Sequence, residues 1–226
     1  MQNNWKITPY LFLFPAILLL TIFFFLPFFQ TIIYSFQDYS NDIYTPVFGT
    51  LSNYKTLYHS PVFIKSLVNT FYFLILTTPF LVVFPLFLAI LINQKIRGKT
   101  LYKLIIYLPV VVSIVVVAIA FKWLYAPNGL LNYFMEIFNL PKISWLSSPR
   151  VAMISVALVT IFKGVGYYMM IYLASLMSVP KELYEAAEID GANEFQKHLT
   201  VTIPHIMPTI ALVSTISAIS ALKVFV

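Results

Sequence analysis

Long apolar blocks alternate with short polar segments along the whole chain. Five such blocks cover residues 10–36, 66–92, 104–124, 151–177 and 204–226. Each is about as long as the roughly 20 residues that an α-helix needs to cross the hydrocarbon core of a bilayer. We therefore predict an all-α membrane protein, a single bundle of transmembrane helices over residues 1–226.

The two outermost blocks carry further expectations. The first opens after Trp5-Lys6, exceeds the length of a signal-peptide core and has no small-residue cleavage site after it, so we expect it to remain as a span. Pro15 and Pro27 mark places where this helix is expected to bend. The last block is still apolar at Val226. We expect that the sequence stops inside a fifth helix and that a complete chain has six.

Composition agrees with a membrane protein and excludes several other classes. Hydrophobic residues make up 60% of the 226 residues and charged residues only 10%, too few for the surface of a soluble domain. The net charge of +6 does not form a basic stripe interleaved with exposed aromatic residues, so no nucleic-acid partner is predicted. Cysteine is absent, and His59, His198 and His205 lack the spacing of metal ligands. No metal and no cofactor are predicted.

The distribution of basic residues predicts the orientation of the helices. If the amino terminus is cytoplasmic, the inner segments hold seven basic residues and the outer loops hold four. The inner ones are Lys6, Lys95, Arg97, Lys99, Lys103, Lys181 and Lys197, and the outer ones are Lys55, Lys65, Lys142 and Arg150. Basic residues are enriched in cytoplasmic loops. We therefore expect a cytoplasmic amino terminus and a cytoplasmic location for residues 178–203.

Residues 178–203 form the most polar segment between two apolar blocks, and their pattern predicts a short helix. Pro180 suits a first helical turn, and Glu182 and Glu185 suit the positive end of the helix dipole. Gly191 is a good terminator. A helix of about eleven residues is too short to span a bilayer.

This short helix has the properties of a handle for a soluble partner. Ala186 and Ala187 leave a patch of small residues that a partner surface can approach closely. A second short helix is expected over residues 193–202, leading to Ile203-Pro204 and the last span. A partner that holds such a helix on the cytoplasmic side can transmit movement to the rigid spans on either side.

The same segment resembles a known family. Glu185-Ala186-Ala187, then Gly191, then Ile203-Pro204 closely resemble the EAA loop of permease subunits of binding-protein-dependent ABC importers. The string from residue 180 to residue 208 is similar to the sugar-uptake branch, the maltose and oligosaccharide type. The residues at 108–113 and 129–132 also resemble this branch, so the resemblance covers essentially the whole chain. One departure is Ile203, where the family usually has Leu.

The resemblance implies a polytopic bundle of the ABC importer permease type that imports a carbohydrate. Residues 180–191 would be the coupling helix. The implied ATPase-coupling residues are Glu182, Glu185, Ala186, Ala187, Asp190, Gly191, Ile203 and Pro204. The implied partners are cytoplasmic ABC ATPase subunits, a second permease subunit in a heterodimer, an extracytoplasmic solute-binding protein, the sugar and membrane lipid. The implied location is the cell membrane. The chain itself would not be an enzyme.

Gly98-Lys99-Thr100 looks like the end of a phosphate-binding loop, but the motif needs a glycine where Asn93 stands. ATP is therefore expected to bind a separate subunit.

Candidates for lining the pathway are Asn69, Lys163, Tyr167, Tyr168 and Met170, with ordinary helix packing as the alternative. Lys163 lies nearest the middle of its block. It is either a functional intramembrane charge or a side chain that extends outward to the membrane surface.

Two other transport hypotheses and one enzymatic hypothesis compete with sugar import. The same machinery would also serve glycerol phosphate or another small polar solute. A secondary carrier would need acidic residues at membrane depth, whereas Asp and Glu occur only in loops here. A membrane-embedded enzyme would need clustered Asp, His or Ser at that depth, and the sequence has no such cluster.

Overall fold

The computed structural model describes residues 8–38, 47–94, 97–149 and 151–224. The chain divides into two compact units, Met1–Leu67 and Val68–Val226. Three basic residues of the orientation argument, Lys6, Lys95 and Arg150, lie outside the described residues. Nearly all of the described structure is helical, which confirms the prediction of an all-α bundle.

The first unit begins with one long apolar helix. It comprises α1 (Thr8–Leu20), a widened π-helical turn η2 (Thr21–Phe25) and α2 (Leu26–Ser35). The turn η2 ends where Pro27 enters the first turn of α2. Since proline has no N–H to donate, the wider turn replaces the bend expected there. No residue of this helix is buried within the described structure.

The polar residues 37–65, between the first two apolar blocks, contain regular structure. Strands β1 (Gln37–Asp38) and β2 (Val47–Phe48) pair antiparallel, with Gln37 opposite Phe48. Helix α3 covers Ser52–His59. The Asn53 side chain explains the ordering, because its Nδ2 donates to the carbonyl oxygens of Ser35 (3.2 Å) and Gln37 (2.8 Å). One amide thus holds α3 to the end of α2.

The third apolar block is broken in the structure, where the sequence predicted a single span over 104–124. Helix α4 (Pro61–Asn93) is continuous, but α5 (Lys99–Val111) and α6 (Ile114–Leu124) meet at an angle of 96°. Between them Val112 and Ser113 are extended. Pro109 weakens the end of α5 because it cannot donate a helical hydrogen bond, and the β-branched valines that follow lose side-chain freedom in a helix.

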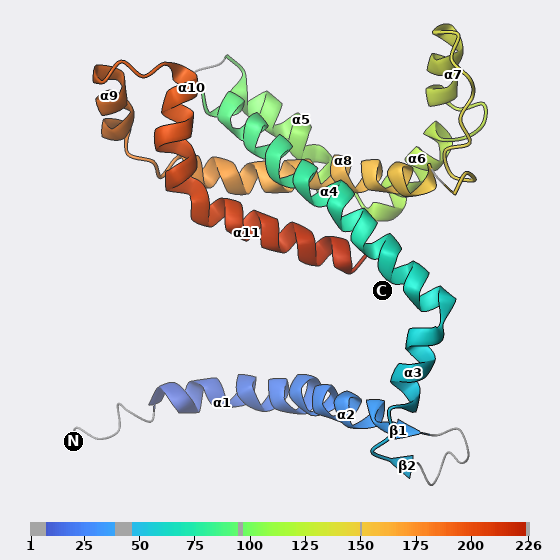
Figure 1. Cartoon of the computed structure of the whole chain (residues 1–226). Coiled ribbons are helices and arrows are strands. Elements are labelled where there is room, and N and C mark those ends of the chain that lie inside the picture. The colour runs from blue at the N-terminus through green and yellow to red at the C-terminus, as the bar shows by residue number, and fades with distance from the viewer. Residues whose placement is uncertain (1–7, 39–46, 95–96, 150, 225–226) are drawn as a thin grey trace, which may run out of the picture. The chain divides into compact units, whose positions relative to one another are not determined.

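The remaining elements complete the second unit (Figure 1). They are α7 (Leu130–Ile137), α8 (Ala152–Leu176), α9 (Lys181–Ile189), α10 (Glu194–Lys197), the π-helical turn η3 (His198–Thr202) and α11 (Ile203–Leu222). Among the described residues, four helices are long and apolar enough to cross a membrane, or five spans if the bent pair α5–α6 counts as one. This agrees with the five spans predicted.

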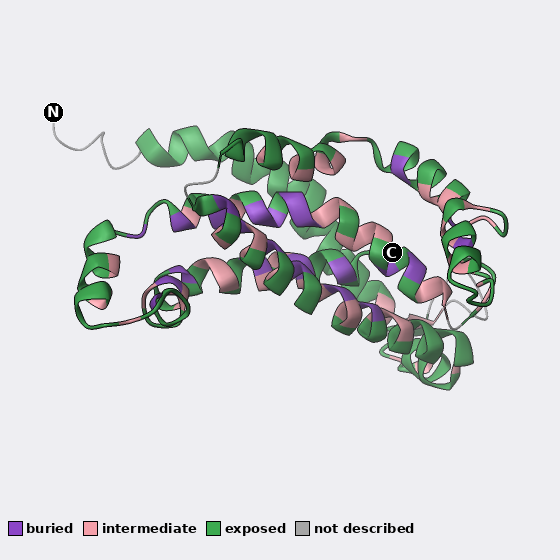
Figure 2. Cartoon of the chain, turned by 90° about the horizontal axis from the view of Figure 1, so that it is seen from above, coloured by how far each residue is buried: buried purple, intermediate pink, exposed green. Residues whose placement is uncertain are grey.

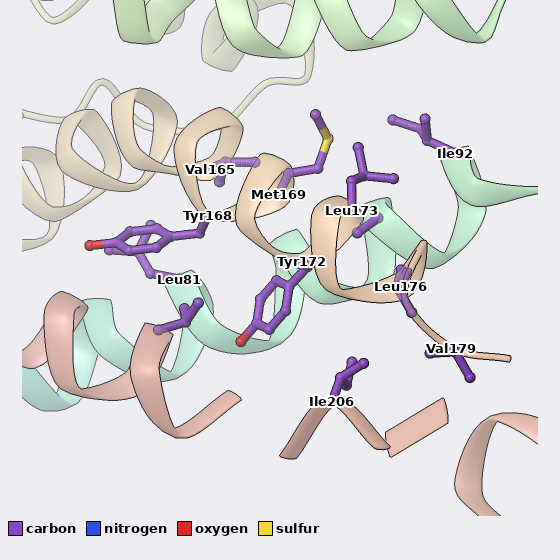
Figure 3. Close-up of a cluster of buried hydrophobic side chains, with 12 residues drawn as sticks. Leu81, Ile92, Val165, Tyr168, Met169, Tyr172, Leu173, Leu176, Val179 and Ile206 are labelled. Carbon is purple, nitrogen blue, oxygen red and sulfur yellow. The ribbon is translucent and has the colours of Figure 1, made fainter. Parts of the chain in front are cut away.

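Helix α8 is the centre of the second unit. Tyr172 and Met169 of α8 are fully buried, and residues of α4 and α11, such as Leu81 and Ile206, belong to the same cluster (Figure 3). Gly166 allows α5 to approach closely, because a Cβ there would collide with a backbone carbonyl of α5. Exposed residues nevertheless cover most of the helix surfaces (Figure 2). These apolar surfaces suit a lipid environment.

A buried asparagine organises the segment between α6 and α8. Asn132, on α7, is 1% exposed. Its Nδ2 donates to the carbonyl oxygens of Pro127 (3.1 Å) and Ile143 (3.0 Å), and its Oδ1 accepts from the Ile143 N–H (3.0 Å) and from Trp145 Nε1 (3.2 Å). These bonds fix α7 at the end of α8 opposite to α9.

Candidate functional site

Helix α9 has nine residues rather than the eleven predicted, since Pro180 lies before it instead of in its first turn, whereas Gly191 terminates it as expected. Pro180 precedes it with an extended backbone, and Gly191 follows it with φ of +80°. The Gly191 N–H donates to the Glu188 carbonyl (3.0 Å) and the Ala192 N–H to the Ala187 carbonyl (2.9 Å). This is the Schellman arrangement, which a glycine in the left-handed region completes without steric strain.

The two faces of α9 differ in what they contact. Glu182, Glu185, Ala186 and Ile189 follow the spacing of one helix face and are all exposed. Ile189 is 87% exposed although the surrounding segment is polar. An apolar side chain that is bare in such a segment is typical of a surface that binds a partner.

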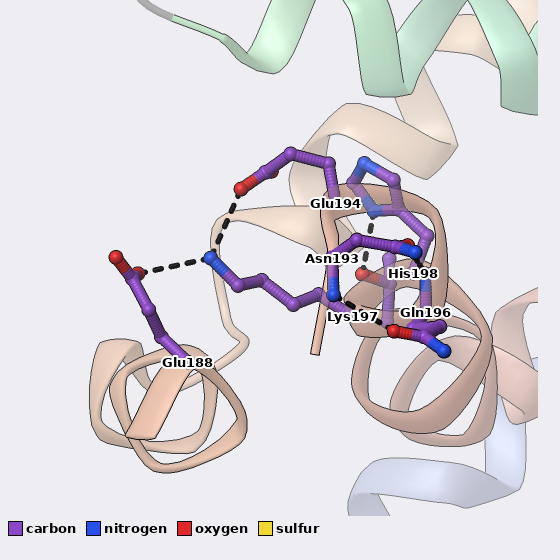
Figure 4. Close-up of polar contacts among 7 residues, drawn as sticks. Glu188, Asn193, Glu194, Gln196, Lys197 and His198 are labelled. Atoms are coloured by element: carbon purple, nitrogen blue, oxygen red, sulfur yellow. Dashed lines mark hydrogen bonds and ion pairs between the residues drawn. The ribbon is translucent and has the colours of Figure 1, made fainter. Parts of the chain in front are cut away.

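The opposite face of α9 is tied to the next helix through a lysine. Lys197 of α10 is only 7% exposed. Its Nζ lies 2.9 Å from Glu188 Oε2 of α9 and 2.9 Å from Glu194 Oε1 (Figure 4). One cation therefore joins the last turn of α9 to the first turn of α10. Hydrogen bonds to a charged donor and acceptor are stronger than those between neutral groups.

A second contact joins α9 to the start of the last long helix. Tyr184 Oη of α9 lies 2.9 Å from Thr202 Oγ1, and the Nδ1 of His198 lies 3.0 Å from the same oxygen. Thr202 is fully buried and ends η3, directly before α11. The hydroxyl of Thr202 thus connects the inner face of α9 to the base of α11.

The segment after α9 is part of the last long helix rather than a separate short helix as predicted. Asn193 and Gln196 form a capping box at its start, in which the Asn193 side chain accepts the Gln196 N–H (2.9 Å) and the Gln196 side chain accepts the Asn193 N–H (2.8 Å). From Glu194 the helix runs through η3 to Leu222. Continuity arises because Pro204 occupies a first-turn position of α11, and the wider turn η3 absorbs its missing donor.

The sequence-predicted residues of this segment therefore fall into three places. Glu182, Glu185 and Ala186 lie on the exposed face of α9, and Ala187 is half-buried. Asp190 and Gly191 cap the end of α9. Ile203 and Pro204 form the first turn of α11.

A cavity of about 760 Å³ lies among the helices of the second unit. Of the predicted pathway residues, Lys163, Tyr167 and Tyr168 line it, whereas Asn69 and Met170 do not. The wall also contains hydroxyl groups from α4 and α11, including those of Thr77, Ser217 and Ser220.

Lys163 lies at the break between α5 and α6 instead of extending outward along α8. Its Nζ donates to the carbonyl oxygens of Val110 (3.3 Å) and Val112 (3.0 Å). The broken helix leaves these carbonyl groups without helical donors, and an unpaired buried carbonyl is costly. The alternative in which Lys163 reaches the membrane surface is therefore wrong, because inward partners are available half-way along α8.

Sequence reasoning missed several of these residues. Lys197 was counted only as a cytoplasmic charge, and neither its burial nor its pairing with Glu188 has a signal in the sequence. The pairing with Glu194 does have a signal in the sequence, because residues three apart on a helix are neighbours. Lys122, which also lines the cavity, stands in the last turn of α6 and was not considered.

Comparisons with known proteins give a consistent result. Residues 46–226 match the family described as binding-protein-dependent transport system inner membrane component. The probable ABC transporter permease protein YurN of Bacillus subtilis (strain 168) is 35% identical over 224 residues, which cover 96% of this chain and 76% of that protein. The arabinooligosaccharides transport system permease protein AraP of Halalkalibacterium halodurans is 33% identical over 99% of this chain and 71% of its own length.

A solved structure agrees with these relatives. A bacterial ABC transporter involved in the import of the acidic polysaccharide alginate contains a chain that superimposes with a TM-score of 0.83 and 28% sequence identity. The superposition covers 99% of this chain and 78% of that one.

Proposed function

This chain belongs to the family of binding-protein-dependent transport system inner membrane components, and from that premise we propose that it is the permease subunit of an ABC importer for a carbohydrate. It is a multi-pass membrane protein and a transport component rather than an enzyme. The carbohydrate is supported by the relatives that carry arabinooligosaccharides and alginate.

The single observation that carries the coupling role is the contrast between the two faces of α9. The inner face is bonded through Glu188 and Tyr184 to the base of the last long helix. The outer face, with Glu185 and the bare Ile189, is exposed and makes no contact among the described residues that would explain its composition. In our proposal a cytoplasmic ATPase subunit holds this outer face, and the inner contacts pass its movement to α11.

In our proposal α9 is cytoplasmic because basic residues gather at its end of the second unit. Helix α5 begins at the same end of the second unit as α10 (Figure 1). Its first turns contain Lys99 and Lys103, and Arg97 precedes it. Since basic residues are enriched on the cytoplasmic side, this end is the cytoplasmic one. Helix α8, of 25 residues, is long enough to cross the bilayer, so α7 at its other end faces the outside. Successive spans alternate in direction, so counting back from α8 through α5–α6, α4 and the helix α1–α2 gives a cytoplasmic amino terminus in our proposal.

The remaining partners complete the proposed importer. A solute-binding protein, which the family description names as a requirement, would deliver the sugar at the outer end near α7. A second permease subunit would form the other wall of the path, and the cavity lined by Tyr167 and Tyr168 would be this chain's part of it. Aromatic rings beside hydroxyl groups suit a sugar, which has apolar faces and polar edges.

Reconstitution tests this proposal. The chain is inserted into proteoliposomes with its ATPase, its partner permease and its binding protein, and uptake of labelled arabinooligosaccharides and other saccharides is measured. We expect uptake that requires ATP on the α9 side. We also expect Glu185→Lys to abolish uptake without affecting membrane insertion, because it reverses the charge on the outer face of α9.

Glu136→Lys, on the exposed part of α7, is the matched control and should leave the ATPase coupling intact. Uptake that needs no ATP and follows an ion gradient would contradict the proposal and favour a secondary carrier.

A further inference from the structure

The charge on the wall of the cavity is entirely positive. Lys122 and Lys163 line it, and no acidic side chain is among the described residues of its wall. The ion pairs among the described residues include neither of these lysines. The cavity therefore holds two cations whose charge no carboxylate in the described part of the chain neutralises.

The position of Lys163 is fixed by the break in the third span. Its two acceptors, the carbonyl groups of Val110 and Val112, belong to the chain segment that leaves α5. Both acceptors are neutral, so the ammonium keeps its full charge. An ammonium group has three N–H donors, and two carbonyl acceptors leave one for a ligand.

The low polarity of the surroundings makes this charge effective. Most of the other wall residues are apolar or aromatic, including Leu81, Ile114 and Phe121. Charges interact far more strongly in such an environment than in water. An uncompensated cation in a membrane-embedded wall is costly, and a bound anion lowers that cost.

We propose that the cavity accepts an acidic saccharide, one that carries a carboxylate, and that Lys163 is its specificity-determining residue. The carboxylate accepts the remaining N–H of Lys163, while the sugar rings lie against Tyr167 and Tyr168. Lys122 adds to the attraction from the last turn of α6. This inference rests on the proposed function and makes its substrate class more specific.

Phosphate esters share the anionic chemistry, so the test must separate them from carboxylates. The assembled importer in proteoliposomes is offered trisaccharides of galacturonate, glucuronate and mannuronate, each beside its carboxyl-reduced neutral form. Glycerol 3-phosphate is the phosphate arm. Each matched pair differs only in whether a carboxylate or an alcohol stands on the ring, so stereochemistry cannot produce the preference.

We expect uptake of at least one acidic trisaccharide to exceed that of its neutral form by about tenfold, because a single desolvated charge contact is worth about that factor. In Lys163→Met the preference should disappear, and in Lys163→Arg, which keeps the charge, it should persist. Lys122→Met leaves the contacts at the α5–α6 break intact. It should reduce the preference by about threefold, since that lysine is exposed and better screened.

Several outcomes would overturn the inference. They are equal or better uptake of the neutral forms, an unchanged preference in Lys163→Met, and uptake of glycerol 3-phosphate without any acidic saccharide. If Lys163→Met fails to insert into the membrane, the inference is tested by the preference of Lys122→Met and Lys163→Arg for the acidic over the neutral trisaccharide. Failure of the proposed function is a different result, namely ATP-dependent uptake of no saccharide of either kind.

Discussion

Lys197 Nζ lies 2.9 Å from Glu188 Oε2, so the helix that a partner would hold is bonded to the helix that leads into the membrane. The lysine is nearly buried, while both of its carboxylate partners are largely exposed. The contact therefore fixes the position of α9 relative to α10. Its removal should loosen this connection without unfolding either helix.

Lys197→Met tests the connection between α9 and α10. The substitution preserves most of the buried side-chain volume and removes both ion pairs. We expect uptake per ATP hydrolysed to fall by about threefold or more, within the range of coupling energies that single residues carry. Uptake and ATPase activity are measured together in proteoliposomes.

Lys181→Met is the control, since this exposed lysine begins α9 and should leave the ratio unchanged. An unaltered ratio in Lys197→Met would mean that the ion pairs do not transmit movement.

The end of α9 depends on a conformation that only glycine adopts easily. A Cβ at Gly191 would meet no atom within 4 Å, so any effect of Gly191→Ala comes from φ alone. We expect this variant to weaken the helix end by about 1 kcal/mol and to increase proteolysis of the loop over residues 178–203 about fivefold. Gly191→Asn should have a smaller effect, because Asn tolerates the left-handed region. Equal sensitivity of the two variants would show that tolerance of the left-handed region does not set the effect at this position.

The buried amide of Asn132 should stabilise the segment around α7, at the end of α8 opposite to α9. Asn132→Ala leaves the half-buried Ile143 and Trp145 groups without their partner, which we expect to cost about 2 kcal/mol. The midpoint of thermal unfolding in detergent should fall clearly, whereas it should not change in Asn128→Ala, at an exposed position in the loop just before α7. If the two midpoints agree, water replaces the asparagine without loss.

The parts of the fold that were predictable are those that depend on local sequence. The apolar blocks are long enough to identify spans without tertiary information. The end of α9 was likewise predictable, because Gly191 terminates the helix, and its start was predicted to within a residue of Pro180. Both signals act within a few residues of the position that they determine.

The break between α5 and α6 depends on tertiary contacts. Pro79 and Pro85 lie inside the unbroken α4, whereas α5 ends two residues after Pro109. A proline in an apolar block therefore does not distinguish a break from a continuous helix. The difference is that Lys163, far away in the sequence, donates to the carbonyl groups that the break exposes.

The lining of the cavity was only partly predictable for a related reason. Which side of a helix faces a cavity depends on how the helices pack, and the apolar spans have no polar face that would reveal it. Tyr167 and Tyr168 were proposed because aromatic rings can stack on sugar faces, and both line the cavity. Asn69 was proposed with them but is not part of the cavity wall.

The central claim is that the outer face of α9 is cytoplasmic and holds the ATPase subunit. The chain contains no cysteine, so Ala186→Cys introduces a single thiol on this exposed face. Its matched control is Tyr133→Cys on the exposed side of α7. The measurement is thiol-specific crosslinking in the assembled importer, together with labelling of intact cells by a membrane-impermeant reagent.

We expect the thiol at position 186 to crosslink to the ATPase subunit and to remain unlabelled from outside, and the thiol at position 133 to behave in the opposite way. Labelling of position 186 in intact cells, or its crosslinking to the binding protein alone, would show that α9 is not the cytoplasmic coupling helix.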